Sequence, residues 1–172
     1  HEFVDNAVSN AVPTADGEGV YALLLDPQGR IETDLYVFTA ADRLLLVTPP
    51  GEAGPLAADW REKTFIQDVD IDDATEDFAV FGVYGPTATE KVASVSPLQP
   101  PEDPLAFVRG SMGEAGVTVI RDDGLTGEEG YLVVCAADAA VEVFDTLETR
   151  GMNAAPVGYV TWLSLTLEAG TP

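Results

Sequence analysis

Four prolines fall within nine residues of this 172-residue chain, in the segment 96–104 with the sequence Ser-Pro-Leu-Gln-Pro-Pro-Glu-Asp-Pro. A proline ring fixes φ and removes the backbone N–H donor, so these residues can continue neither a helix nor the hydrogen-bond ladder of a sheet. We therefore expect a surface loop or linker at 96–104. It would divide the chain into a first segment at 1–95 and a second at 105–172.

Hydrophobic periodicity on both sides of this linker predicts a mixture of strands and helices. The turn residues Asp-Pro-Gln-Gly at 26–29 separate two apolar runs, which indicates a β-hairpin formed by 19–26 and 30–38. Strands that alternate with helices favour an α+β or mixed α/β sheet covered by helices over an all-β sandwich. We expect further strands at 43–47, 65–77, 78–84, 117–121 and 131–136, with 65–77 at a sheet edge and 78–84 the most buried, and helices at 56–63, 85–94, 138–150 and 157–167.

The charge balance is strongly acidic, with 30 Asp and Glu residues against 8 Lys and Arg and a formal net charge of −22. Such a surface repels phosphate backbones and anionic lipid headgroups, so we expect no nucleic acid and no membrane among the partners. An acid excess with only two lysines and 46% hydrophobic residues is typical of a halophilic protein, because concentrated salt screens the self-repulsion. An ordinary acidic protein is the alternative.

The cysteine content and the termini bear on the compartment. Cys135 is the single cysteine, so no intramolecular disulfide can form, which fits a reducing compartment. No apolar run approaches the ~20 residues that cross a bilayer, and no basic segment followed by an apolar one opens the chain. We expect a soluble, cytoplasmic protein. Because the chain starts at His1 rather than Met, we also expect a piece of a longer polypeptide.

Several reaction chemistries are disfavoured by the residues. His1 is the single histidine, and nothing fixes its geometry at the chain terminus, so a hydrolytic triad is not supported. Cys135 lies in the apolar run 132–136, which is typical of a small buried thiol rather than a nucleophile. The acidic segment 68–77 lacks the glycine and the glutamate of a calcium-binding loop. We interpret it as a solvated strand face and expect no metal site.

Three motifs resemble one known family. Residues 124–131 read Gly-Leu-Thr-Gly-Glu-Glu-Gly-Tyr, residues 165–170 read Leu-Thr-Leu-Glu-Ala-Gly, and residues 25–35 read Leu-Asp-Pro-Gln-Gly-Arg-Ile-Glu-Thr-Asp-Leu. Together they resemble the glycine-cleavage aminomethyltransferase (T-protein) family and its folate-binding relatives that assist iron–sulfur proteins. The resemblance implies an α+β folate-binding fold with ferredoxin-like lobes around a folate channel. Residues 1–95 would form its first segment and 105–172 a second, ferredoxin-like segment that stops before the C-terminal barrel domain.

Asp34 is the candidate catalytic residue. On the residues alone, a carboxylate on a strand just after a tight turn is typical of a solvated sheet edge. The T-protein pattern Gly-Gly-x-x-Asp-Asp-Leu carries an essential aspartate, and this chain matches it at Gly29, Asp34 and Leu35. The resemblance implies that Asp34 orients and electrostatically activates the folate nitrogen that attacks the methylene group. A fixed carboxylate suits this role because it stabilises positive charge as an aminomethyl group loses ammonia.

Four further positions correspond to folate contacts of the family, and most of them have diverged. Leu132 stands where the family has a glutamate that holds the pteridine ring, and the retained Glu128 fits the turn better than the ring site. Trp162 stands where an arginine contacts folate; it can stack or fill space but cannot neutralise a glutamate tail. Thr48 lies in the segment 46–49, which replaces the Val-Val-Asn-Ala lining of the folate channel.

These residues support two functions. Retention of Asp34 favours an aminomethyltransferase-like, tetrahydrofolate-linked one-carbon transferase whose donor is a lipoyl-carrying protein. Leu132 and Trp162 favour a non-catalytic folate-binding accessory protein for iron–sulfur enzymes. A structural protein with an empty pocket is the third alternative.

Overall fold

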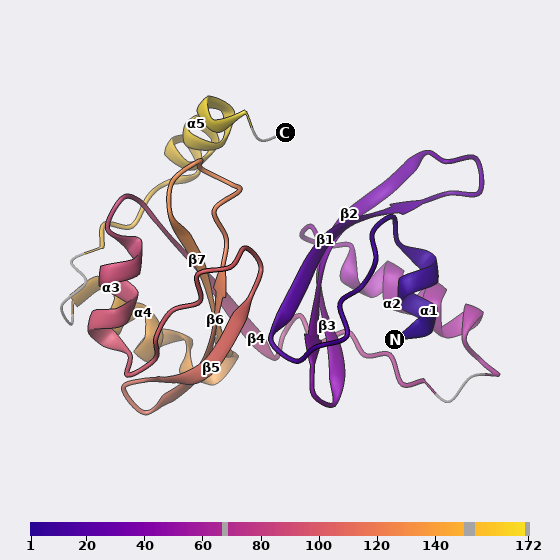
Figure 1. Cartoon of the computed structure of the whole chain (residues 1–172), viewed down its shortest axis with the longest axis horizontal. Coiled ribbons are helices and arrows are strands. Elements are labelled where there is room, and N and C mark those ends of the chain that lie inside the picture. The colour runs from indigo at the N-terminus through magenta and orange to yellow at the C-terminus, as the bar shows by residue number, and fades with distance from the viewer. Residues whose placement is uncertain (67–68, 150–153, 171–172) are drawn as a thin grey trace. The chain divides into compact units, whose positions relative to one another are not determined.

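The computed structural model describes residues 1–66, 69–149 and 154–170, and the chain divides into two compact units (Figure 1). The first unit is His1–Thr75 and the second is Glu76–Pro172. Each unit has its own antiparallel sheet, with three strands in the first and four in the second. The α+β class expected from the sequence is therefore present in both units.

The sheet of the first unit is built from neighbouring strands, β1 (Glu18–Leu25), β2 (Ile31–Ala40) and β3 (Arg43–Val47), in the order β1-β2-β3. The turn between β1 and β2 is held by Asp26, whose Oδ1 accepts hydrogen bonds from the backbone N–H groups of Gln28 and Arg30 at 2.9 and 2.8 Å. Gly29 has a φ of +79°, a conformation that favours glycine. The predicted hairpin is thus confirmed, and its turn chemistry is local.

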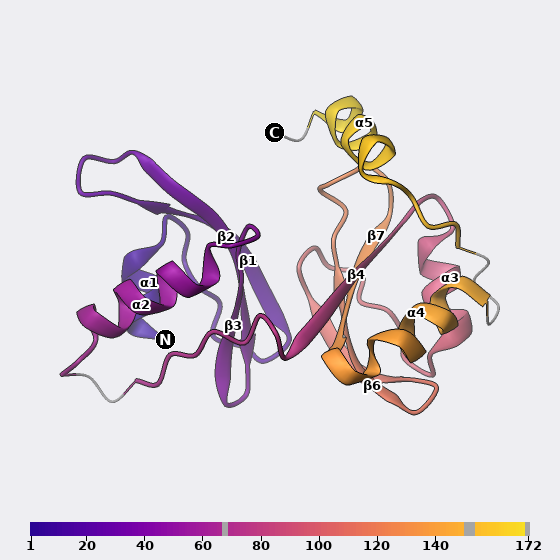
Figure 2. The same ribbon diagram turned by 180° about the vertical axis from the view of Figure 1, so that it is seen from behind.

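One face of this sheet is covered by two helices, α1 (Glu2–Ala7) and α2 (Ala53–Lys63), which Figure 2 shows on the same side of the strands. Successive strand residues point to opposite faces, so Leu35 and Val37 point toward the helices, where both are buried. Each such side chain contributes about 1.5–3 kcal/mol when it leaves water. The buried cluster comprises Val4, Val12, Leu24, Leu35, Val37 and Trp60.

The edge strand expected at 65–77 is wrong for the described part of that segment. Residues 67–68 lie outside the described residues, and 69–74 form neither helix nor strand. Instead, the guanidinium of Arg61 in α2 donates a hydrogen bond to the carbonyl oxygen of Ile71 at 2.6 Å, and the Ile71 side chain packs on the first-unit core. The segment is held by the Arg61 side chain and by packing of Ile71. Its alternating apolar residues therefore do not correspond to strand pairing in a sheet.

The sheet of the second unit has the strand order β4-β7-β6-β5. Its strands are β4 (Phe78–Tyr84), β5 (Phe107–Met112), β6 (Ala115–Arg121) and β7 (Gly130–Ala136). The helices are α3 (Ala88–Val95), α4 (Ala140–Thr149), which follows the short 3-10 turn η1 (Ala137–Ala139), and α5 (Tyr159–Ala169). None of the helices in the described ranges has the length and apolar character that a membrane span requires.

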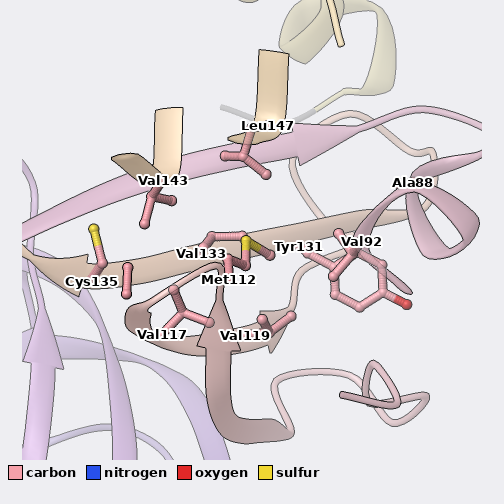
Figure 3. Close-up of a cluster of buried hydrophobic side chains, with 11 residues drawn as sticks. Ala88, Val92, Met112, Val117, Val119, Tyr131, Val133, Cys135, Val143 and Leu147 are labelled. Atoms are coloured by element: carbon pink, nitrogen blue, oxygen red, sulfur yellow. The ribbon is translucent and has the colours of Figure 1, made fainter. Parts of the chain in front are cut away.

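The core of the second unit lies between this sheet and the helices α3 and α4 (Figure 3). Tyr131, Val133 and Cys135 alternate along β7 and point into the core, where Val92 of α3 and Val143 of α4 meet them. Cys135 is a free, buried thiol, as its apolar surroundings in the sequence indicate. Burial raises the pKa of this thiol, which makes it a poor nucleophile.

The prediction that 78–84 is the most buried strand is wrong. β4 is an edge strand that pairs with β7, and its residues Phe78 and Val80 are 44% and 48% exposed. The central strands β6 and β7 carry most of the fully buried residues instead. The apolar composition of β4 does not distinguish an edge from a centre, because that distinction depends on pairing with residues far along the chain.

The proline-rich segment 96–104 contains neither helix nor strand, but it lies inside the second unit rather than between two segments at 1–95 and 105–172. The hydroxyl of Ser96 donates a hydrogen bond to the carbonyl oxygen of Ser111 at 2.8 Å. The side chain of Leu98 packs so closely over Gly110 that a Cβ there would overlap it. Prolines indicate irregular backbone, and side-chain packing of this kind decides to which unit it belongs.

Candidate functional site

Asp34 lies in β2 on the face of the first sheet opposite to α1 and α2. Its neighbours Leu35 and Thr33 point the other way, toward the helix-covered side. The Asp34 side chain is half-buried, and its Oδ2 accepts a hydrogen bond from the hydroxyl of Tyr21 at 3.1 Å. The carboxylate is therefore held by a neighbouring strand rather than free in solvent.

Aromatic rings flank this carboxylate on the same face. The ring of Tyr21 lies 5.2 Å from that of Tyr36, and Tyr36 stacks on Phe38 with 6.2 Å between centroids and 6° between planes. Burial raises the pKa of Tyr21, and the hydrogen bond to Asp34 and its charge raise it further. Tyr21 therefore stays protonated and continues to donate to Asp34 near neutral pH.

A carboxylate beside a row of aromatic rings offers two complementary contacts. The fixed negative charge stabilises a positive charge that develops nearby, and the partly exposed ring of Tyr21 can accept a cationic or flat group, whereas Phe38 is only 1% exposed and supports the row from within. These are the contacts that a flat heterocycle with a cationic reacting centre needs. Asp34 and the ring of Tyr21 therefore offer one contact of each kind.

A cavity of about 440 Å³ lies on the other side of the first sheet and is not lined by Asp34. Leu24, Leu56 and Glu32 are among its lining residues. The strand register shifts between Leu24 and Leu25, which explains why Glu32 does not follow the simple alternation that would place it beside Asp34. Thr48 follows the end of β3 and is half-buried, outside this cavity lining.

The second unit brings Leu132 and Trp162 to one region. Leu132 in β7 pairs with Gly82 in β4 and faces away from the α3–α4 core. The ring of Trp162 in α5 lies 5.0 Å from the ring of Tyr84, two residues beyond Gly82, at an angle of 49°. Glu128 is exposed in the turn between β6 and β7, as expected for a turn residue.

Tyr84 was not singled out from the sequence, although it joins these two positions. Its hydroxyl donates a hydrogen bond to Oδ2 of Asp122 at 2.6 Å, and Asp122 is only 2% exposed. Burial raises the pKa of Asp122, and the hydrogen bond from Tyr84 opposes that shift. Gly82 in the middle of a strand is a local signal of close approach by another group, and here the ring of Tyr84 lies against it.

A second polar cluster connects α3 to the β6–β7 turn. The guanidinium of Arg121 lies over the ring of Tyr131, donates to its hydroxyl at 2.5 Å and pairs with Asp123. Thr89 donates to Glu129 at 2.8 Å and also hydrogen-bonds the Tyr131 hydroxyl. These groups bond to one another, so we interpret the cluster as support for the turn. Within the described ranges, no three His, Cys, Asp or Glu side chains are grouped to hold a metal ion.

Comparison with known proteins identifies the family. The sequence model of the GCVT N-terminal domain matches residues 1–172, which is the whole of the chain. The chain belongs to the GCVT N-terminal domain family. The resemblance to T-proteins that three short motifs indicated is thereby confirmed over the full length.

Relatives of this GCVT-domain chain agree with that assignment. It is 34% identical over 174 residues to an aminomethyltransferase of Bordetella bronchiseptica, covering 98% of this chain and 46% of that protein. It is 31% identical over 159 residues to an aminomethyltransferase of Chromobacterium violaceum, covering 90% and 42%. The chain thus spans about half the length of these curated relatives.

A solved structure supports the fold. The crystal structure of glycine cleavage system aminomethyltransferase T from Bartonella henselae superposes with a TM-score of 0.79, over 99% of this chain and 46% of that one. Its sequence identity is 24%, so the likeness concerns the fold. The expected T-protein fold is confirmed for the part of the protein that this chain represents.

Proposed function

We propose that this chain contributes to an aminomethyltransferase-like, tetrahydrofolate-linked one-carbon transferase of the T-protein family, with Asp34 as its activating carboxylate. The observation that carries the proposal is the hydrogen bond from Tyr21 to Asp34 on the aromatic face of the first sheet. Family membership over the whole chain and the curated aminomethyltransferase relatives support it.

The chemistry asks for a fixed carboxylate. Tetrahydrofolate, when bound, supplies the nitrogen that accepts the one-carbon unit. Asp34 would orient its ligand and stabilise positive charge at the reacting centre, and a neutral residue could not stabilise that charge. Tyr21 keeps the carboxylate in one orientation, which lowers the cost of arranging it during the reaction. A lipoyl-carrying protein is the proposed donor.

We expect this protein to bind tetrahydrofolate with lower affinity than a protein whose site has charged contacts to the ligand. Leu132 cannot accept a hydrogen bond, and Trp162 carries no charge. Each lost charge-assisted hydrogen bond is worth about 1.5–3 kcal/mol, or roughly one to two orders of magnitude in Kd. Thr48 and Glu128, like Leu132 and Trp162, stay proposed ligand positions. Saturation would then require high ligand concentrations.

A second candidate is a non-catalytic folate-binding accessory protein for iron–sulfur enzymes. The specific observation in its favour is the replacement of two family ligand positions by Leu132 and Trp162. This candidate binds the same ligand but transfers no one-carbon unit. The two functions therefore differ in turnover and agree in binding.

The deciding experiment uses the full-length protein in concentrated potassium chloride. Calorimetric titration with tetrahydrofolate measures binding, and an aminomethyl-transfer assay with a lipoyl-carrying donor measures turnover. Asp34→Asn is expected to lower turnover by about 100- to 1,000-fold while the melting temperature is retained. Asp42→Asn, an exposed change in the β2–β3 turn, is the matched control and should leave turnover unchanged.

The outcomes separate the two candidates. Binding without transfer in the wild type would favour the accessory protein. Full turnover in Asp34→Asn would show that Asp34 does not activate the reaction. No binding at millimolar tetrahydrofolate would remove both folate functions.

A further inference from the structure

We propose that Tyr84 is a positioning residue that holds the indole of Trp162 as a stacking surface for the flat ring system of a pterin-type ligand. This inference rests on the proposed function, because it concerns how the second unit contacts the same class of ligand. It assigns recognition of the ligand to aromatic stacking, because the Leu132 side chain offers no hydrogen bond and Trp162 carries no charge.

The ring of Tyr84 packs against two glycines. Gly82 and Gly130 occupy paired neighbouring strands, and the ring lies against both of them. A Cβ at Gly82 would come within 2.5 Å of Cε2 of Tyr84, and a Cβ at Gly130 would overlap the ring and the backbone oxygen of Asp122. Glycine at both positions therefore leaves room for the Tyr84 ring, and at Gly130 also for the backbone of Asp122.

The hydroxyl group of Tyr84 is also held in place. Oδ2 of Asp122 accepts its hydrogen bond at 2.6 Å, and the backbone N–H of Asp122 donates to the carbonyl oxygen of Gly130 at 2.8 Å. Because Asp122 is 2% exposed, its carboxylate is shielded from solvent and cannot itself meet a ligand freely. Asp122 thus fixes the far end of the Tyr84 ring, while the glycines fix its face.

Tyr84 also contacts α5. The centroids of the Trp162 and Tyr84 rings lie 5.0 Å apart, and Cβ of Ala169 in α5 lies 3.6 Å from the position that a Cβ on Gly127 in the β6–β7 turn would take. Figure 1 shows α5 next to this turn. Trp162 is half-buried, so part of its ring surface remains accessible beyond the contact with Tyr84. The indole of Trp162 therefore packs on a tyrosine whose hydroxyl is hydrogen-bonded and whose ring is packed against the sheet.

The indole of Trp162 suits a flat, conjugated ligand. Stacking on an indole needs no charge, and Leu132 on the same face of the sheet adds an apolar contact. Concentrated salt screens charge pairs but strengthens the burial of apolar surface. In a chain with a net charge of −22, an aromatic contact would keep its strength in salt where an arginine contact would lose much of its own.

The test measures binding of tetrahydrofolate to the full-length protein by calorimetry, in dilute and in concentrated potassium chloride. Trp162→Leu is expected to raise the Kd about tenfold, and Tyr84→Phe, which keeps the ring but removes the hydroxyl, to raise it a few-fold. Trp162→Phe should recover part of the affinity. Tyr159→Leu removes a 76% exposed aromatic ring from the same helix and should leave the Kd unchanged.

A second readout follows the indole itself. In each background the emission of Trp162 is taken as the difference between the protein with Trp162 and its Trp162→Phe variant, which cancels the other tryptophans of the full-length protein. Tetrahydrofolate should quench this difference signal. Tyr84→Phe should reduce that quenching at an unchanged melting temperature, which a merely structural role would not do.

Each result bears on the proposal. Wild-type binding with an unchanged Kd in Trp162→Leu overturns the stacking role and leaves the proposed function standing. If the Kd rises in Trp162→Leu but is unchanged in Tyr84→Phe, the positioning role of Tyr84 is overturned. No binding by the wild type overturns the proposed function and this inference together. If Trp162→Leu fails to fold, the Kd of Trp162→Phe and the quenching in Tyr84→Phe decide.

Discussion

The hydroxyl of Tyr21 in β1 donates a hydrogen bond to Oδ2 of Asp34 in β2, with 3.1 Å between the two oxygens. The two residues are diagonal neighbours, since Tyr21 pairs with Tyr36 and Asp34 pairs with Leu23. The backbone ladder therefore fixes the relative positions of the two residues, and the hydrogen bond joins their side chains. This arrangement is more rigid than one that a loop would give.

The charge of Asp34 should be visible in the titration of Tyr21. Burial, the hydrogen bond to Asp34 and its charge all raise the pKa of Tyr21. Asp34→Asn removes the charge, so we expect the pKa of Tyr21 to fall toward its ordinary value while the effect of burial persists. The measurement is phenolate absorbance against pH, with Tyr21→Phe identifying the Tyr21 signal. An unchanged titration in Asp34→Asn would contradict the contact.

Two aspartates should show opposite dependences of stability on pH. Burial raises the pKa of Asp122, so its contribution to stability is full below the ordinary aspartate pKa and is lost as pH rises through the raised value. The hydrogen bond from the Arg30 backbone is the main cause that lowers the pKa of Asp26. The contribution of Asp26 is present above the ordinary pKa and is lost as pH falls.

The measurement for this pair is the free energy of unfolding of the wild type minus that of Asp122→Asn or Asp26→Asn, across acidic pH. The first difference should fall as pH rises, and the second should increase. Using differences cancels the titration of the many other carboxylates. Slopes of the same sign for both variants would contradict the assignment.

Gly130 should tolerate no side chain. A Cβ there would overlap the ring of Tyr84 and the backbone of Asp122, so Gly130→Ala is expected to destabilise the protein by about 1–3 kcal/mol. Gly116 on the neighbouring strand β6 has open space within 4 Å of the position that a methyl group would take, and Gly116→Ala is the matched control. Denaturant unfolding measures both variants. Equal stabilities of Gly130→Ala and Gly116→Ala would show that Tyr84 is not closely packed on Gly130.

Two valines on α4 provide a test of the second core. Val143 is fully buried among the core side chains, whereas Val141 is 73% exposed. Val143→Ala is expected to cost about 2 kcal/mol, because two buried carbons and the space they fill are lost. Val141→Ala should change stability by less than about 0.5 kcal/mol. A reversed order in denaturant unfolding would contradict the packing of α4 on the sheet.

The parts of the fold that could be predicted depend on contacts close in sequence. Asp26 and Gly29 specify the first hairpin by hydrogen bonds and backbone geometry within four residues. The edge position of β4 could not be predicted, because it depends on pairing with β7 and on what β7 pairs with next. β5 was missed, since its Arg109 and Gly110 break the apolar alternation.

The candidate site shows the same division. Asp34 could be proposed because the short segment with Gly29, Asp34 and Leu35 resembles a T-protein motif, whereas the residues alone indicate a solvated sheet edge. The bond between Tyr84 and Asp122 joins residues 38 positions apart, and neither residue has a short-range pattern that points to the other. Pairing of β4 with β7, and the turn that leads into β7, brings them together.

The two sheets differ in when their strands become available during synthesis. β1, β2 and β3 follow one another directly, so the first sheet can form its ladder once the chain has been made as far as Val47. β4 is translated long before β7, the strand with which it pairs in the described sheet. Until β7 has been made, the apolar strand β4 is unpaired and can form non-native contacts with other chains. Slow elongation between Tyr84 and Gly130 would therefore favour aggregation of the nascent chain.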